Sequence, residues 1–222
     1  CMQKEVLSDL FEFLDNSPTP YHAVQQTIRT LQAQGFNELH EKNHWDLDND
    51  GLYYVAREGS VIAFRTAGAD IKEKGFRLVG AHTDSPCLKI KPMPDIRRHE
   101  LLQLGVEIYG GALLSTWFDR DLSLAGRVNC LLKNDEREAF LIDFKRAIAT
   151  IPSLAIHLFR NVHNNRSINS QTEMIPILCN ISTKENVDLA SILKQQVFDQ
   201  HQREDIKLVS HFDISCYDTQ NS

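Results

Sequence analysis

The sequence contains the stretch Phe76-Arg77-Leu78-Val79-Gly80-Ala81-His82-Thr83-Asp84-Ser85-Pro86, in which a mostly apolar run leads directly into a polar segment. The run at 76–81 has the short apolar pattern of a buried β-strand. In extended backbone, residues i and i+2 face the same side, so the Asp84 side chain can reach the His82 imidazole. We therefore expect an α/β unit in which one strand ends in a polar His-Asp pair.

The spacing of this pair gives His82 two possible roles. If the Asp84 carboxylate accepts the imidazole N–H, it fixes the tautomer and makes the other ring nitrogen a better metal donor. The alternative is a loop histidine that is hydrogen-bonded to a carboxylate without any metal. Because a catalytic metal site typically needs about three protein ligands and an open position, two residues could form only part of one.

Two helices are predicted on the N-terminal side of this stretch. Residues 2–14 place apolar side chains at helical spacing, which predicts one amphipathic helix. A second helix has Thr19 as its N-cap, Pro20 in the first helical position and Gly35 as its C-terminal stop. Strand patterns at 52–57 and 61–66 then flank a Glu-Gly-Ser turn and predict a hairpin.

The C-terminal side is predicted to be mostly β. Short strand-like runs occur at 101–109, 122–132, 139–144, 154–158, 206–209 and 212–217, with one helix at about 186–200. This pattern predicts three parts: residues 1–90 as an α/β part, 91–205 as a β-rich domain, and 206–222 as the start of a further part.

Composition limits the class of protein. The 222 residues carry 24 Lys and Arg against 30 Asp and Glu, so the net charge of −6 has the wrong sign for nucleic-acid binding. No apolar run is long enough to span a membrane, and the N-terminus lacks the pattern of a signal peptide. The five cysteines form no C-x-x-C pair and are expected to be free thiols. We therefore expect a cytoplasmic protein that binds neither nucleic acid nor membranes.

Two further places could carry function. In residues 116–121 two acids bracket Arg120 beside two large aromatic residues, and we favour a structural role because guanidinium–carboxylate pairs commonly lock turns or interfaces. In residues 154–158, period-two alternation would place Leu154, Ile156 and Leu158 on one face and His157 on the other. If the leucine face is buried, His157 points to solvent or to a partner chain.

Five segments, in this order, make the chain resemble the aspartyl aminopeptidase family of self-compartmentalising zinc aminopeptidases. They are Ser17-Pro18-Thr19-Pro20-Tyr21-His22-Ala23, Gly80-Ala81-His82-Thr83-Asp84-Ser85-Pro86, Ser115-Thr116-Trp117-Phe118-Asp119-Arg120-Asp121-Leu122, Leu154-Ala155-Ile156-His157-Leu158 and Asp218-Thr219-Gln220. The resemblance extends along the chain but covers only the N-terminal half of such an enzyme. It implies an incomplete zinc-aminopeptidase catalytic domain with an inserted, mostly β dimerisation domain.

The resemblance also implies roles for individual residues. His82 matches a ligand of a pair of zinc ions, and Asp84 matches the catalytic-site aspartate that supports this ligand. His157 matches a histidine that reaches the active site of a neighbouring subunit and contacts substrate there. The implied reaction is removal of N-terminal, acidic residues from peptides by a self-associating enzyme whose remaining metal ligands lie beyond residue 222. The alternative is a non-catalytic assembly or regulatory protein that keeps the dimerisation domain.

Overall fold

A computed structural model describes residues 2–66, 68, 75–158, 167–182 and 187–220, with side chains described from Val6 onward. The chain divides into two compact units between Asp84 and Ser85. Each unit has its own sheet, and strand pairing keeps residues 206–218 in the sheet of the second unit. The assignment of 1–90, 91–205 and 206–222 to domains of a longer enzyme stays a prediction.

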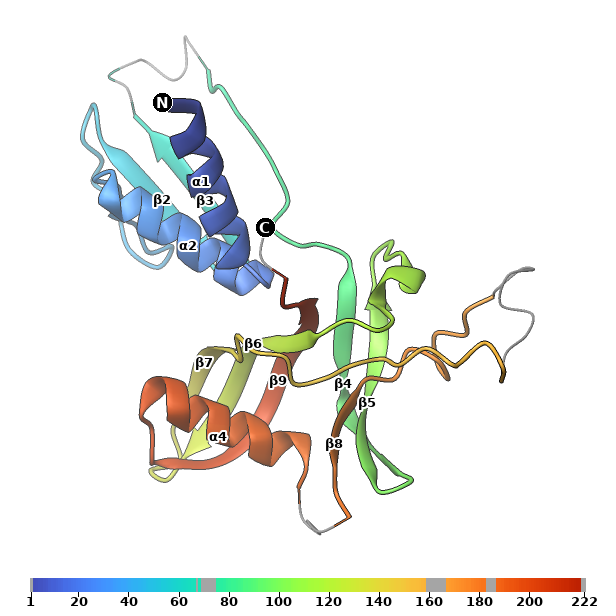
Figure 1. Cartoon of the computed structure of the whole chain (residues 1–222). Coiled ribbons are helices and arrows are strands. Elements are labelled where there is room, and N and C mark those ends of the chain that lie inside the picture. Colours follow the sequence, from blue (N-terminus) through green and yellow to red (C-terminus); the bar gives the residue numbers. More distant parts are fainter. Residues whose placement is uncertain (1, 67, 69–74, 159–166, 183–186, 221–222) are drawn as a thin grey trace. The chain divides into compact units, whose positions relative to one another are not determined.

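In its described residues, the first unit combines two helices with a three-stranded sheet (Figure 1). Its elements are α1 (Met2–Asp15), α2 (Pro20–Ala33), β1 (Asn37–Glu38), β2 (Leu52–Arg57) and β3 (Ser60–Arg65). β1 pairs with β2 in parallel, and β2 pairs with β3 as the predicted antiparallel hairpin. α2 packs against β2 and β3, whereas the apolar side chains of α1 from Val6 to Leu14 are largely exposed.

The ends of α2 have the predicted N-cap, first-turn proline and C-terminal glycine, with one difference at the N-cap. Thr19 is the N-cap in extended conformation and Pro20 opens the helix, while Gly35 follows the helix with a positive φ of 82°. The Thr19 hydroxyl makes no capping bond to the backbone. It lies 2.7 Å from Nδ1 of His22 instead, and both side chains are buried. The polar pair therefore fixes the first turn of α2 through side chains.

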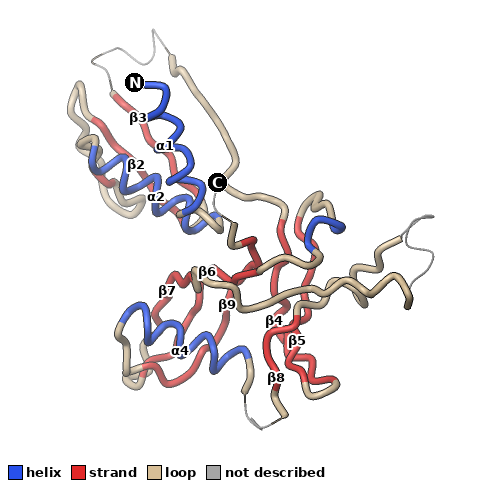
Figure 2. The backbone as a smooth tube through the Cα atoms, viewed as in Figure 1, coloured by secondary structure: helices blue, strands red, loops and turns tan. Residues whose placement is uncertain are grey.

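The strand predicted at 76–81 is wrong. The segment is drawn as a loop in Figure 2, and its apolar side chains are exposed, with Leu78 at 87% and Val79 at 101%. Local apolar character shows that a segment can be buried, but a strand also needs a partner for its backbone N–H and C=O groups. No described segment of the first unit pairs with this one.

The second unit is built on a six-stranded antiparallel sheet with the order β7-β6-β9-β4-β5-β8. Its elements are β4 (Cys87–Arg98), β5 (Leu101–Tyr109), the 3-10 helix η1 (Leu114–Trp117), β6 (Leu122–Leu132), β7 (Arg137–Asp143), β8 (Ile177–Asn180), α4 (Leu189–His201) and β9 (Ile206–Asp218). β9 is one continuous strand, although the sequence predicted two runs. The predicted mostly β character of this region is confirmed.

The core of the second unit lies between this sheet and α4. Leu189, Leu193 and Val197 of α4 are fully buried, and α4 contacts β7 and β9. The helix begins at Leu189, within the predicted range; residue 186, where the prediction began, lies outside the described residues. Among the described residues, no helix has both the length and the apolar content that crossing a membrane requires.

The strand predicted at 154–158 is also wrong. The segment is irregular and closes a turn in which the Leu158 N–H donates to the Ala155 carbonyl at 2.9 Å. Leu154, Ile156 and Leu158 are 58%, 48% and 73% exposed, so the expected buried leucine face is absent from this structure. Residues 151–158 instead form an arm that leads away from the sheet (Figures 1 and 2). A period of two predicted a strand, but no neighbouring strand of the described chain pairs with it.

Candidate active-site residues

The structure brings His82 and Asp84 together at the end of the first unit. Nδ1 of His82 lies 2.7 Å from the Asp84 backbone carbonyl oxygen and 3.3 Å from the Asp84 carboxylate oxygen Oδ1. The sequence predicted a contact with the carboxylate, and the backbone carbonyl is the nearer of the two acceptors. The His82 side chain is 80% exposed, so it is accessible for contacts with other groups.

These acceptors determine which nitrogen of His82 carries the proton. A carbonyl oxygen can only accept a hydrogen bond, so Nδ1 must be the donor. In a neutral imidazole Nε2 then has the free electron pair, and this is the form in which histidine binds a metal. The local arrangement therefore prepares Nε2 of His82 as a metal donor.

The neighbouring residue ties this pair to the rest of the unit. The Thr83 hydroxyl donates to the Gly59 carbonyl at 2.8 Å, which anchors the 82–84 segment to the turn between β2 and β3. That turn packs closely against the start of α2, because a Cβ added at Gly59 would lie 3.5 Å from Cβ of Pro20. The segments 17–23 and 80–86, which are distant in sequence, thus both meet this turn.

The donor set fits part of a zinc site. Histidine nitrogen is a preferred zinc ligand, and a ligating histidine usually donates its other N–H to a carbonyl or a carboxylate, as His82 does. Among the described residues, no group of three or more His, Cys, Asp or Glu side chains could enclose a metal ion. Among the described residues, His82 is thus oriented as a zinc ligand would be, but it has no neighbouring His, Cys, Asp or Glu side chains that complete a metal site.

His157 lies in the second unit, on the arm defined above. Its side chain is exposed, and so are the apolar side chains around it. The structure therefore agrees with the expectation that His157 faces away from the core, although the reason is an exposed turn and not an alternating strand. Its predicted contact with substrate stays a prediction.

Asp119, Arg120 and Asp121 make structural contacts, as the sequence favoured, but with partners that it did not indicate, and Asp121 does so through its backbone carbonyl. The Arg120 guanidinium pairs with Asp218 at the end of β9, 98 residues away. Oδ1 of Asp119 accepts the Ser153 N–H at 2.8 Å. The Asp121 carbonyl accepts both the N–H and the hydroxyl of Thr219, each at 3.0 Å. Such long-range partners leave no local signal in the sequence.

The buried thiols do not provide a nucleophile. Desolvation raises the pKa of Cys216 to about 12 and, with a contribution from Glu138, that of Cys130 to about 11. A thiol is a good nucleophile only when its pKa is low enough to give thiolate at neutral pH. The four cysteines that the structure describes are free, as predicted.

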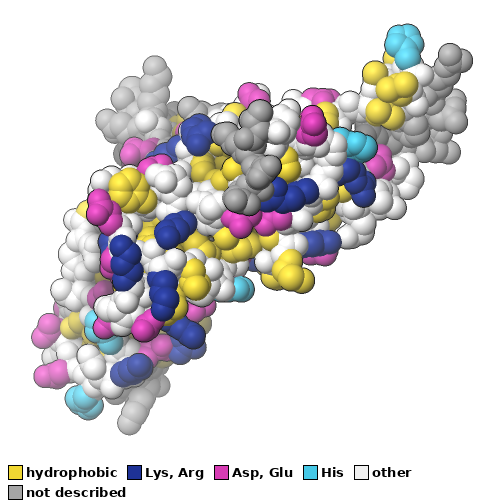
Figure 3. Space-filling view, turned by 90° about the horizontal axis from the view of Figure 1, so that it is seen from below, with side chains coloured by type: hydrophobic (Ala, Val, Ile, Leu, Met, Phe, Trp, Pro, Cys, Tyr) yellow, Lys and Arg dark blue, Asp and Glu magenta, His cyan; other side chains and the backbone are white. Residues whose placement is uncertain are grey.

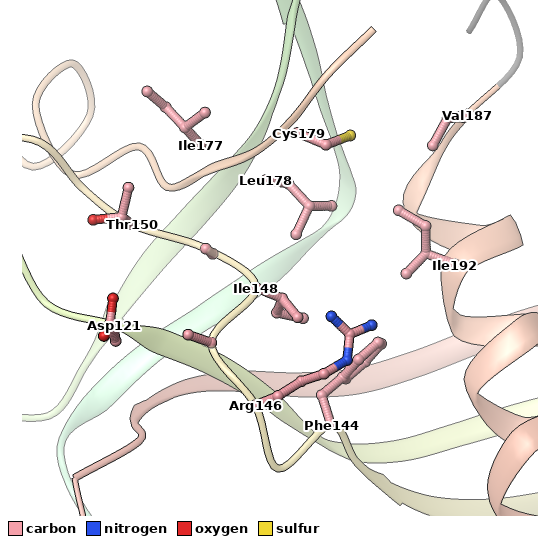
Figure 4. Close-up of a pocket in the computed structure, with 12 residues that line it drawn as sticks. Asp121, Phe144, Arg146, Ile148, Thr150, Ile177, Leu178, Cys179, Val187 and Ile192 are labelled. Carbon is pink, nitrogen blue, oxygen red and sulfur yellow. The ribbon is translucent and has the colours of Figure 1, made fainter.

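A pocket of about 720 Å³ lies in the second unit between β8, α4 and residues 144–150 (Figure 4). Its walls are mainly apolar, and the Arg146 guanidinium lies 5.9 Å from the centre of the Phe144 ring. Neither His82, Asp84 nor His157 lines this pocket. Over the face drawn in Figure 3, acidic and basic side chains are interspersed with hydrophobic ones, so that face has no uniform charge.

Comparison with known proteins identifies the family. Residues 13–222 match the Aminopeptidase I zinc metalloprotease (M18) family. The Probable M18 family aminopeptidase 2 of Stutzerimonas stutzeri is 47% identical over 220 residues, which are 99% of this chain and 51% of that protein. The protein of the same name from Pseudomonas aeruginosa is 46% identical over 222 residues, or 100% of this chain and 51% of its own.

Solved structures give the same result for the fold. A chain in a cryo-EM structure of an Ape4 and Nbr1 complex matches with a TM-score of 0.89 and 34% identity. The match covers 96% of this chain and 44% of the chain in that structure. Chaetomium thermophilum mApe1 matches 96% of this chain and 51% of its own, with a TM-score of 0.83 and 28% identity. The chain thus spans about half the length of its relatives, and the resemblance and fold class predicted from the sequence are confirmed. It belongs to the Aminopeptidase I zinc metalloprotease (M18) family.

Proposed function

We propose that this chain is part of a zinc-dependent aminopeptidase that removes N-terminal, acidic residues from peptides. The observation that carries the proposal is the hydrogen bonding of His82, which leaves Nε2 as the metal-binding nitrogen within a chain of this family. When bound, zinc supplies a Lewis acid and lowers the pKa of water to near neutrality. The substrate class rests on the resemblance to aspartyl aminopeptidases.

The residues of this chain would each have a separate task. His82 holds the metal through Nε2, and Asp84 keeps the proton on Nδ1 through its carbonyl and carboxylate oxygens. Thr83 holds both at the β2–β3 turn. The remaining ligands, the second zinc and the general base would come from the half of the enzyme that this chain does not span.

His157 would act on the substrate of a neighbouring copy. Its arm is exposed and carries Leu154, Ile156 and Leu158, which are large apolar side chains. Clusters of exposed apolar residues commonly mark protein–protein contacts. The arm is therefore suited to packing against a second copy of this protein, with His157 at the contact.

The test uses the full-length product of the gene, assayed on aspartyl, glutamyl and leucyl arylamides with zinc present. We expect the acidic substrates to be preferred. Asp84→Asn should lower kcat/KM about 10- to 100-fold, the usual effect of altering the partner of a metal-binding histidine, and His82→Gln should lower it further. The variant His44→Gln is the matched control, because His44 is an exposed histidine of the same unit with no proposed role.

Zinc content separates the possible outcomes of this test. If His82→Gln lowers both zinc per chain and activity while His44→Gln changes neither, the proposed role of His82 stands. Unchanged zinc and activity in His82→Gln would overturn it. A gene that ends at residue 222, with a product that lacks hydrolase activity, would favour the non-catalytic assembly protein.

A further inference from the structure

We infer that Asp119, Arg120 and Asp121, here called the anchor triplet, position two elements of the second unit that serve the active site, the arm that carries His157 and the end of β9. The triplet holds the base of the arm that carries His157 and also holds the end of β9. The inference rests on the proposed function, because that function gives the arm its contact with substrate. The inference adds the residues that would fix the positions of the arm and of residues 218–220, where the backbone leaves β9.

Asp119 holds the arm through two hydrogen bonds. Its side-chain Oδ1 accepts the Ser153 N–H at 2.8 Å, and its backbone N–H donates to the Ile151 carbonyl at 2.9 Å. Ile151 is 1% exposed, so this end of the arm is fixed in the core. Ser153 lies four residues before His157, at the point where the arm becomes exposed. Asp119 therefore acts at the last fixed position before the free part of the arm.

Asp119 is also suited to this position by its backbone. Its φ is +57°, in the left-handed region, where asparagine and aspartate are much more frequent than other residues with a Cβ. Asp119 lies in the turn that follows η1, and this conformation lets successive residues face different segments. A single short turn can thus contact the arm through one residue and β9 through the next two.

Arg120 and Asp121 hold the end of β9. The Arg120 guanidinium pairs with Asp218 and also donates to the Thr116 carbonyl of η1. The Asp121 carbonyl accepts two hydrogen bonds from Thr219. Because β9 ends at Asp218 and Thr219 follows it directly, these contacts fix the backbone where it leaves the sheet.

These contacts can be removed without disturbing the core. The Arg120 and Asp218 side chains are 42% and 27% exposed, so the pair is partly open to solvent, and ion pairs screened by solvent contribute little to stability. Together with Asp119, Asp121 and Gln220 they line an open pocket of about 330 Å³, which can accommodate a changed side chain. A misplacement of about 1 Å at a substrate contact can lower the rate about 100-fold. The triplet should therefore affect catalysis more than folding.

The test compares two variants of the full-length enzyme. Asp119→Gly removes the acceptor of the Ser153 N–H, and glycine adopts a positive φ without strain. Asp119→Asn keeps an acceptor oxygen and tolerates the same φ. We expect Asp119→Gly to raise KM for an aspartyl arylamide by about 10- to 100-fold, because the arm contacts substrate. Asp119→Asn should restore KM to within about threefold of the wild-type value, since the hydrogen bond can re-form.

Arg120→Gln gives an independent measurement at the other end of the triplet. We expect it to lower kcat by about tenfold or more with little change in KM, because under the proposed function the end of β9 would connect to the part of the enzyme that holds the remaining zinc ligands. The matched control is Arg203→Gln, which breaks ion pairs with Glu138 and Asp205 in the same unit, away from the triplet. The control should leave both kcat and KM near wild type.

The outcomes are distinguishable from failure of the proposed function. A wild-type enzyme with no aminopeptidase activity would overturn the proposed function. An active wild type for which Asp119→Gly and Arg120→Gln both keep kcat and KM would overturn only the positioning role. If Asp119→Gly does not fold, Arg120→Gln decides the question by itself, and equal effects of Arg120→Gln and Arg203→Gln would count against the inference.

Discussion

Gly126 has the least room for a side chain among the described glycines. It lies buried in β6 with φ of +154°, between Ile142 of β7 and Ile214 of β9. A Cβ added there would lie 2.0 Å from the Asp213 carbonyl oxygen and 2.9 Å from Cα of Ile214. Both neighbours are backbone atoms of the central strand β9, so they cannot move aside as a flexible side chain could.

We therefore predict that Gly126→Ala lowers the free energy of unfolding by about 2–4 kcal/mol. Gly111→Ala is the control, because a Cβ at Gly111 meets nothing within 4 Å, and its effect should stay within about 0.5 kcal/mol. Urea denaturation of the 222-residue chain in a Trp45→Phe background would measure both, with Trp117 as the fluorescent reporter of the second unit. Equal stability of the two variants would contradict the packing described for Gly126.

At the residue scale, the sequence predicted the His82–Asp84 contact, because the spacing of two residues is local. It could not indicate that the backbone carbonyl of Asp84 is the nearer acceptor, since that depends on the turn at 82–84. The sequence also could not predict the partners of Arg120. Asp218 is 98 residues away, and only the assembled sheet brings β6 and β9 together.

Among the elements, α4 has the best-defined start. Asp188 is its N-cap and accepts the Ser191 N–H at 2.8 Å, while the Asp188 N–H donates to the Ser191 hydroxyl at 3.2 Å. The hydrogen bonds from Ser191 lower the pKa of the Asp188 carboxyl group below its usual value. Because the folded state favours the ionised form, this carboxylate stabilises the fold at neutral pH.

We predict that Asp188→Ala lowers the free energy of unfolding by about 1 kcal/mol at pH 7. A lowered pKa in the folded state means that the stabilisation is present above the unfolded-state pKa and is lost as the pH falls through the folded-state value. The difference between wild type and variant should therefore shrink below about pH 4. Denaturation measured at pH 7 and pH 3 would check this, and a difference that is constant with pH would contradict the role of the charge.

The elements show where sequence patterns succeed and where they fail. Helix α2 and the β2–β3 hairpin were predicted because their caps, turn and pairing partners are all local in sequence. The strands expected at 76–81 and 154–158 were wrong, because pairing partners cannot be read from the segment itself. β8 was missed since its four residues give too short a pattern to recognise.

For the whole molecule, the order of the sequence motifs predicted the family and the fold class, which no single helix or strand could predict. Five short segments in the right order identified the family, and the comparisons confirm it. The described residues contain no complete set of metal ligands, and the chain covers 51% of the length of its relatives. Under the proposed function, His82 would therefore be one of several zinc ligands, and the others would lie outside the described residues.

The most direct test measures hydrolysis of an aspartyl arylamide with zinc present. Two samples are compared: the purified 222-residue chain alone, and the same chain co-expressed with the remainder of the gene product as a second polypeptide. We predict no activity above background for the chain alone, because His82 is one ligand where a catalytic zinc site typically needs about three. We predict activity when both parts are present, and its loss with His82→Gln. Hydrolysis by the isolated chain at the rate of the full-length enzyme would contradict the account.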